Sequence, residues 1–158
     1  MKKIITLIVI ILSLSLIFAG CTEEEEKTAE QLLLEEVDLV IDLYEQAYLT
    51  QDAYLLENNV TDMMIINDED IMKEDFLVVL NYNLGEHYSE IEEYELQERD
   101  YEIFDDSTKV AVIAKEYMVM DAEPFSFDGV FADIIVYLEN VDGNWKIYKI
   151  SVYEIRHH

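Results

Sequence analysis

The stretch VDGNWKIYKI, residues 141–150, decides the fold class of this 158-residue chain. Asp142 and Gly143 are the residue pair that two-residue hairpin turns prefer, because both central positions of such a turn need a positive φ. After the turn, Trp145 and Ile147 flank Lys146, which begins the period of a strand with one buried face. The stretch therefore predicts the last hairpin of an antiparallel sheet.

Strand-like composition extends backward from this hairpin through the second half of the chain. It covers four segments, residues 94–104, 109–120, 129–139 and 145–155. Residues 105–107, Asp-Asp-Ser, predict the first turn, and a loop around Pro124 joins the middle strands. Because residues 131–137 are apolar on both faces, we expect helices to cover one side of the sheet and its own curvature around a cavity to close the other.

The first half of the chain has helical periods. Thr28 and Gln31 have the spacing of a capping box, so they predict the start of the first helix. Its predicted core face consists of Leu33, Val37, Val40, Ile41, Tyr44 and Tyr48. Thr50 is the expected cap of a short second helix at residues 52–59, and residues 62–66 predict a brief strand.

A third helix is expected over residues 70–84, with Gly85 placed to end it. Residues 67–70, Asn-Asp-Glu-Asp, are interpreted as the start of this helix, because they lack the glycine and the distal glutamate of a calcium-binding loop. The apolar run at residues 76–80 also fits a buried strand, but the cap residues and the glycine favour the helix.

The amino-terminal segment has the layout of an export signal. Two lysines at residues 2–3 precede an apolar run at residues 4–18, which is shorter than the roughly 20 residues of a membrane-spanning helix. The sequence FAGC then ends at Cys21, the only cysteine, and resembles the lipobox of prokaryotic lipoproteins, although Phe18 stands where Leu is usual. This resemblance implies cleavage before Cys21 and lipidation of its thiol.

We therefore expect three parts in the chain. They are a signal peptide at residues 1–20, a lipidated Cys21 with an acidic tether at residues 21–27, and a single α+β domain at residues 28–158. The lipid anchor would hold the domain at the extracytoplasmic face of the cell membrane, since two acyl chains give stable anchoring. The alternative is an uncleaved anchor helix, which would place the domain on the same side.

Acidic residues far outnumber basic ones. Once Lys2 and Lys3 are removed with the signal peptide, eight of the ten basic residues remain against 36 acidic ones, a net charge of −28. A basic surface for nucleic acid is therefore excluded, and anionic lipid head groups would be repelled. The acidity fits a strongly solvated surface, a salty or alkaline habitat, or selective binding of a cation or cationic partner.

The predicted order of elements is helix, short helix, strand, helix and four long strands. Over residues 28–155, and most sharply at residues 141–150, this layout resembles the nuclear transport factor 2-like superfamily. The resemblance implies an α+β fold in which N-terminal helices pack on a curved, mainly antiparallel sheet that forms a cone. The superfamily includes isomerases, dehydratases, transport adaptors and exported binding domains, so the fold leaves the function open.

Asp133 is the candidate site residue, because it shares a strand face with Phe131, Ile135 and Tyr137. A carboxyl group and a phenol would then meet on the concave face of the sheet, where burial raises the pKa of the acid and suits it to proton transfer. We take Asp133 and Tyr137 as candidate ligand-binding residues and Asp133 as the candidate catalytic residue. The opposite interpretation places Asp133 on an open face or rim beside water.

No metal site and no cofactor are expected. His87 is interpreted as a surface or capping residue, and His157 and His158 as a tail, since one pair supplies only two of the four ligands that structural zinc normally needs. The preferred function is a non-catalytic module that binds a small ligand or another protein of the cell envelope. The alternatives are a proton-transfer isomerase or dehydratase that uses Asp133, and a homodimeric scaffold.

Overall fold

The computed structural model describes residues 27–86, 91–122 and 125–155. The predicted signal peptide, Cys21 and nearly all of the acidic tether lie outside the described residues, as do His87, Pro124 and the two terminal histidines. Within the described ranges, no helix is long and apolar enough to cross a bilayer.

Two compact units divide the chain, residues 1–32 and residues 33–158. The described part of the first unit contains the start of helix α2 (Ala29–Thr50). There the Gln31 backbone N–H donates to Thr28 Oγ1 at 3.1 Å, and the Thr28 N–H donates to Gln31 Oε1 at 2.8 Å. These two hydrogen bonds confirm the predicted capping box.

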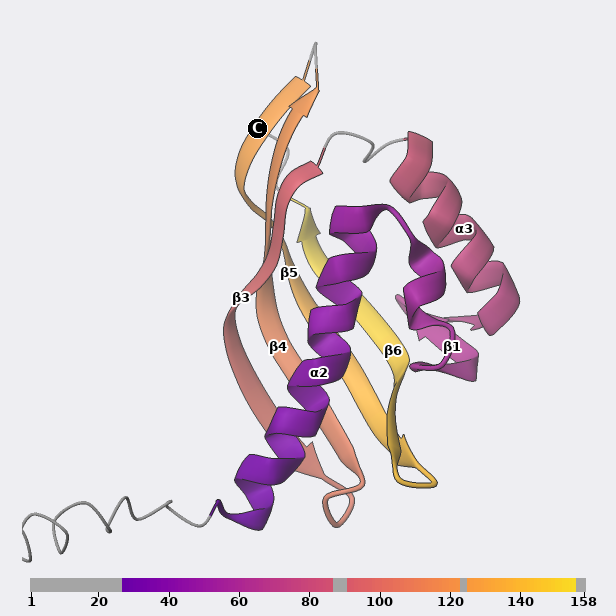
Figure 1. Cartoon of the computed structure of the whole chain (residues 1–158), viewed down its shortest axis with the longest axis vertical. Coiled ribbons are helices and arrows are strands. Elements are labelled where there is room, and N and C mark those ends of the chain that lie inside the picture. Colours follow the sequence, from indigo (N-terminus) through magenta and orange to yellow (C-terminus); the bar gives the residue numbers. More distant parts are fainter. Residues whose placement is uncertain (1–26, 87–90, 123–124, 156–158) are drawn as a thin grey trace, which may run out of the picture. The chain divides into compact units, whose positions relative to one another are not determined.

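The second unit is built on one six-stranded sheet with the strand order β2-β1-β6-β5-β4-β3 (Figure 1). The strands are β1 (Val60–Ile66), β2 (Glu69–Met72), β3 (Ile91–Phe104), β4 (Lys109–Ala122), β5 (Phe125–Val141) and β6 (Asn144–Ile155). Neighbouring strands are antiparallel except β1 and β6, which are parallel. The four long strands of the second half and the α+β class are therefore confirmed.

The remaining elements of this unit lie on one side of the sheet (Figure 1). They are α2 from Leu33 onward, the short 3₁₀-helix η1 (Ala53–Leu56) and α3 (Lys73–Glu86). The core lies between these helices and the sheet, and the side chains of α2 that enter it include Val37, Ile41 and Tyr44. The predicted core face of the first helix is thereby confirmed.

No described helix or strand covers the opposite side of the sheet. The expectation that this side would also be closed off is therefore wrong for the described residues. Aromatic rings and lysine stems shield that side instead. Lys109 Nζ lies 5.6 Å from the ring centroid of Tyr148, and Lys149 Nζ lies 5.5 Å from that of Tyr137. Such side chains cover apolar surface while their charges stay in water.

β1 and β2 form a hairpin where the sequence predicted the start of a helix. Its two turn residues, Asn67 and Asp68, have φ values of 49° and 70°, as a two-residue type I′ turn requires. The Asn67 side chain also accepts a hydrogen bond from the Val152 N–H of β6 at 2.8 Å. The interpretation of residues 67–70 as a helix start is therefore wrong, because α3 begins at Lys73, after β2.

The predicted second helix is a single 3₁₀ turn, η1. Asp52 caps it in place of Thr50, because the Asp52 carboxylate accepts the Tyr54 N–H at 3.0 Å. The Thr50 hydroxyl donates to a carbonyl in the last turn of α2 at 2.7 Å. The turn at Asp142 and Gly143 is confirmed, with φ values of 54° and 85°.

A bulge in β3 aims a basic side chain at α2. Between Gln97 and Asp100, β3 contains one residue more than the facing segment of β4, and Glu98 within it has a φ of 53°. An extra residue reverses the faces of the side chains that follow it. Arg99 and Tyr101 consequently reach α2 from the edge strand of the sheet.

Arg99 binds three carboxylates on one face of α2. Its guanidinium nitrogens lie 3.1 Å from Asp38, 3.4 Å from Asp42 and 2.6 Å from Glu45. Glu45 also accepts the backbone N–H of Leu96 at 2.7 Å. Since β3 is the edge strand, this contact occupies a donor that an incoming strand would otherwise use. These contacts, called the Arg99 clamp below, join α2 to the sheet through polar groups.

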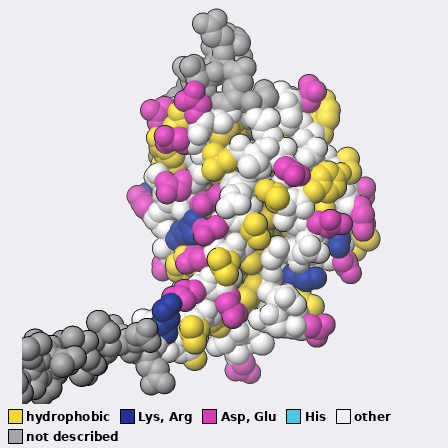
Figure 2. Space-filling view, in the orientation of Figure 1, with side chains coloured by type: hydrophobic (Ala, Val, Ile, Leu, Met, Phe, Trp, Pro, Cys, Tyr) yellow, Lys and Arg dark blue, Asp and Glu magenta, His cyan; other side chains and the backbone are white. Residues whose placement is uncertain are grey.

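Asp and Glu side chains are spread over the surface shown in Figure 2, with few Lys or Arg side chains among them. In the described part of the chain, most basic side chains already hold a carboxylate. The ion pairs besides the Arg99 clamp are Lys73–Asp62, Lys109–Asp105, Lys115–Glu98 and Lys149–Asp68. Acidic side chains therefore dominate the charge of the described part of the chain.

Replacing Arg99 with Met should destabilise the fold by about 2 kcal/mol, because three carboxylates would then face one another without a cation. Urea unfolding, followed by the fluorescence of Trp145, the only tryptophan, measures the loss. Lys115→Met removes the same charge but only a surface ion pair with Glu98, so its effect should stay below about 1 kcal/mol. Equal losses for the two variants would contradict the clamp.

Candidate functional site

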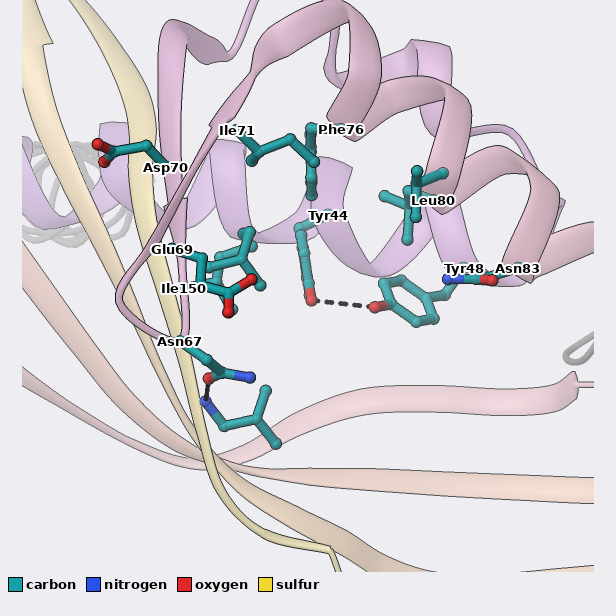
Figure 3. Close-up of a pocket in the computed structure, with 13 residues that line it drawn as sticks. Tyr44, Tyr48, Asn67, Glu69, Asp70, Ile71, Phe76, Leu80, Asn83 and Ile150 are labelled. Atoms are coloured by element: carbon teal, nitrogen blue, oxygen red, sulfur yellow. Dashed lines mark hydrogen bonds between the residues drawn. The ribbon is translucent and has the colours of Figure 1, made fainter.

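A cavity of about 580 Å³ lies between the helices and one end of the sheet. Four elements line it, namely α2, the β1–β2 hairpin, α3 and β6 (Figure 3). Its apolar wall includes Ile66, Ile71, Phe76, Val79, Leu80 and Ile150. This size is within the range of small-molecule sites, roughly 300 to 1,000 Å³.

Two tyrosines of α2 place hydroxyl groups inside this cavity. Tyr44 and Tyr48 lie one helical turn apart, and their hydroxyl oxygens are 3.1 Å from each other, within a hydrogen bond. Figure 3 shows both hydroxyls pointing toward one another between α3 and the sheet. The spacing of four residues explains the pair, because residues i and i+4 share one face of a helix. The cavity therefore combines apolar walls with a phenolic pair.

The β1–β2 hairpin supplies a carboxylate to the same cavity. Its register pairs Ile66 with Glu69 and Met64 with Ile71, so these four side chains share one face of the hairpin. Met64 is fully buried, which identifies that face as the inner one. Asp70 has the opposite orientation. In Figure 3 the Glu69 carboxylate turns toward the tyrosine pair and the Asp70 carboxylate turns away.

A second polar pair lies deeper in the core. The Tyr94 hydroxyl of β3 donates to Glu116 Oε1 of β4 at 2.7 Å, and the two residues are 3% and 5% exposed. The Tyr94 ring stacks on the Tyr48 ring, with centroids 4.0 Å apart and planes 10° apart. Tyr48 therefore has the cavity on one side and the buried tyrosine–glutamate pair on the other.

Burial raises the pKa of the Glu116 carboxyl above its ordinary value, and the hydrogen bond from Tyr94 opposes part of that rise. Burial also raises the pKa of Tyr94 well above its ordinary value, and nearby Tyr44 and Glu116 add to the rise. A carboxyl group in this state can hold a proton at a pH where exposed carboxyl groups are ionised. Neither Tyr94 nor Glu116 lines the cavity, however, so a molecule inside it does not touch them.

Glu116 is the buried carboxylate that sequence reasoning did not find. It lies opposite Leu96 of β3 and Ala132 of β5, in register on the inner face of the sheet. The signal was present in the strand pattern, because Glu116 continues the alternate positions held by Ala114 and Met118. A charged residue at such a position marks a buried polar group.

Asp133 and Tyr137, the two predicted site residues, lie on the outer face of the sheet. Their neighbours Ile134 and Val136 are buried beneath the helices, and alternation along β5 turns the predicted pair the other way. Asp133 borders a shallow depression of about 290 Å³, opposite Lys115 in the register. The expectation that the pair shares the concave face is therefore wrong, since the inner positions of β5 are the even-numbered ones.

The described residues contain no group of three or more His, Cys, Asp or Glu side chains arranged to hold a metal ion. The three carboxylates Asp38, Asp42 and Glu45 do lie close together, but Arg99 occupies the space between them. The cavity itself has one inner carboxylate, Glu69, which is fewer oxygen ligands than a hard divalent cation requires.

Comparison with known proteins identifies the fold. No family model matches the chain, and no curated protein matches its sequence. A nuclear transport factor 2-like protein from Cytophaga hutchinsonii is similar in structure, with a TM-score of 0.57 and 17% identity, over 82% of this chain and 100% of that one.

Two further solved structures have the same architecture. A protein from Caulobacter vibrioides with a cystatin-like fold gives a TM-score of 0.62 at 7% identity, over 77% of this chain and 89% of its own. A protein from Novosphingobium aromaticivorans, proposed to be a scytalone dehydratase, gives 0.62 at 11% identity, over 79% and 90%. The chain therefore has the nuclear transport factor 2-like, cystatin-like fold that the order of its elements predicted. Identities this low show the fold alone.

Replacing Glu116 with Gln should make the stability of the fold less sensitive to alkaline pH. The folded-state pKa of Glu116 lies above its ordinary value of 4.5, so the protonated group stabilises the fold below pH 4.5 and that contribution is lost as pH rises through the folded-state pKa. Gln keeps the acceptor for Tyr94 without the charge. Urea unfolding at pH 4 and pH 8 should show E116Q gaining on the natural chain only at the higher pH.

The matched control for this variant is Glu102→Gln, on the same sheet. Glu102 is exposed on β3, and its substitution makes the same change in net charge. E102Q should follow the natural chain at both pH values to within about 0.5 kcal/mol. A pH dependence of E116Q like that of E102Q would show that Glu116 ionises in the fold as an exposed carboxyl does.

Proposed function

We propose that this chain is a lipid-anchored, extracytoplasmic binding protein that holds a small, largely apolar molecule in the cavity beside Tyr44 and Tyr48. The observation that carries the proposal is a cavity of about 580 Å³ with apolar walls and a hydrogen-bonded phenolic pair inside it. Apolar walls supply affinity and a few polar groups fix orientation, which is the usual division of labour in ligand sites. The fold supports the proposal, because binding modules and enzymes are both built on it.

The positions of Glu116 and Asp133 favour a binding function over proton transfer. Glu116 is the buried carboxyl with a raised pKa, yet the residues that line the cavity include neither it nor its partner Tyr94. A general base must come within hydrogen-bond reach of the proton that it removes. Asp133, the acid expected for an isomerase or dehydratase, lies on the outer face of the sheet. A bound molecule therefore meets the tyrosine hydroxyls, the amides and the exposed hairpin carboxylate of Glu69, and it does not reach the buried Glu116–Tyr94 pair.

Membrane attachment in this proposal rests on the amino-terminal sequence. A short apolar run ends at Cys21, the only cysteine of the chain, and a net charge of −28 after residue 20 argues against adsorption to anionic lipid. Mass measurement of the native protein should find a chain that begins at Cys21 and carries a lipid on its sulfur. An unmodified Cys21 with residues 1–20 still attached would contradict the anchor and leave the cavity proposal intact.

Two neighbouring valines of α3 allow a matched test of the cavity. Val79 lines it and is 51% exposed, whereas Val78 is 57% exposed and does not line it. Val79→Trp should fill the cavity and weaken binding of the neutral probe 2-(1-naphthyl)ethanol about tenfold, a difference of about 1.4 kcal/mol. Val78→Trp adds the same indole to the same helix and should leave the affinity unchanged.

Calorimetry on the full chain in phosphatidylcholine nanodiscs, with empty nanodiscs as the blank, measures both variants. Circular dichroism verifies that each variant keeps its helices and sheet. Equal affinities of V79W and V78W, or no binding by the natural chain, would overturn the cavity as a binding site for apolar molecules.

A further inference from the structure

We propose that the ligand of this cavity is an organic cation, an ammonium group carried on an apolar body. This inference rests on the proposed function, since it names the chemical class that the same cavity accepts. Three features of the described residues support it: the charge of the cavity lining, the position of Glu69, and the aromatic rings beside it.

The charge of the lining is negative and uncompensated. Among the described residues that line the cavity, the charged ones are Glu69 and Asp70, and none is Lys, Arg or His. Lys149 belongs to the adjoining strand β6, but its Nζ bonds to Asp68 at 2.7 Å and lies over the ring of Tyr137 on the outer face. The lysine nearest in the register is thus turned away from the cavity, and an anionic ligand would find no counter-charge there.

Glu69 lies on the inner face of the hairpin, and the residue as a whole is exposed. The hairpin register puts it beside Ile66 on the inner face, and Figure 3 shows its carboxylate turned toward Tyr44 and Tyr48. Within the described part of the chain, no hydrogen bond or ion pair holds the Glu69 side chain. Two other carboxylates of the hairpin do have partners, since Asp62 pairs with Lys73 and Asp68 with Lys149. A cationic ligand would supply the partner that Glu69 lacks.

Aromatic rings complete the environment that an ammonium group prefers. Tyr44, Tyr48 and Phe76 all line the cavity, and ring faces attract cations with an energy that rises when water is excluded. The apolar side chains Leu80 and Ile150 continue the wall beyond the rings. A cation with an apolar body would place its charge near Glu69 and the rings and its hydrocarbon against these residues. A metal ion would gain nothing from the apolar wall.

The long-range field acts in the same direction. The net charge of −28 after residue 20 raises the local concentration of cations near the surface and repels anions. This field is not specific to the cavity, however, so it predicts attraction of any cation. The experiment must therefore separate Glu69 from the general charge.

Three probes with one apolar body test the charge of the ligand: 2-(1-naphthyl)ethyltrimethylammonium, 2-(1-naphthyl)ethanol and 3-(1-naphthyl)propanoate. Calorimetry on the full chain in phosphatidylcholine nanodiscs should find the ammonium probe bound about tenfold more tightly than the alcohol, with the carboxylate weakest. Glu69→Gln should reduce the preference for the ammonium over the alcohol to about twofold.

The matched control is Glu74→Gln, which removes the same charge from an exposed residue in the first turn of α3, outside the cavity lining. E74Q should keep the full preference for the ammonium probe. A loss in E74Q equal to that in E69Q would assign the preference to the general field and overturn the role of Glu69.

The remaining outcomes separate this inference from the proposed function. If the three probes bind alike and Val79→Trp still weakens all of them, the cavity binds apolar molecules and the charge preference is overturned. If the ammonium probe binds but Val79→Trp has no effect, the cation is held elsewhere on the acidic surface, and both the inference and the cavity proposal fail.

Discussion

The inner face of β4 and β5, which carries Val112, Ile134 and Val136, is buried against helix α2. Because side chains alternate along a strand, burying this face decides where every other residue of the two strands lies. It takes Glu116 into the core, where the loss of water raises the pKa of its carboxyl group. It also turns Asp133 outward, so the acid that looked suited to chemistry lies away from the cavity.

Helix α2 packs against the rest of the fold through two different faces. Its apolar face packs into the core and ends in the tyrosine pair, which lines the cavity and stacks on Tyr94. Its acidic face is held by Arg99, which reaches it because a bulge in β3 reverses the direction of the side chains after Gln97. The clamp therefore fixes the helix whose tyrosines shape the site, although it lies outside the cavity itself.

The polar groups of the core are arranged in two layers with different exposure to a ligand. The hydroxyls of Tyr44 and Tyr48 are in the cavity, whereas Glu116 lies behind the stacked ring of Tyr94. A buried carboxyl that keeps one good hydrogen bond is costly to ionise, and such groups often occur at functional sites. Here Glu116 holds the Tyr94 ring that stacks on Tyr48, so it supports the tyrosines from behind. The charged group of the cavity itself is Glu69 of the hairpin.

The sequence by itself determined the order of elements apart from β2, the four long strands, the capping box and the Asp142–Gly143 turn, because each depends on local periodicity or on the φ preferences of a few residues. It did not determine the β1–β2 hairpin, since Asn67 and Asp68 serve a helix start and a type I′ turn equally well. Only the tertiary structure decided which strand face is buried. In the sequence, both faces of these strands carry apolar residues, so either face could be the buried one. The packing of the helices buried the face of Glu116 and left the face of Asp133 outside.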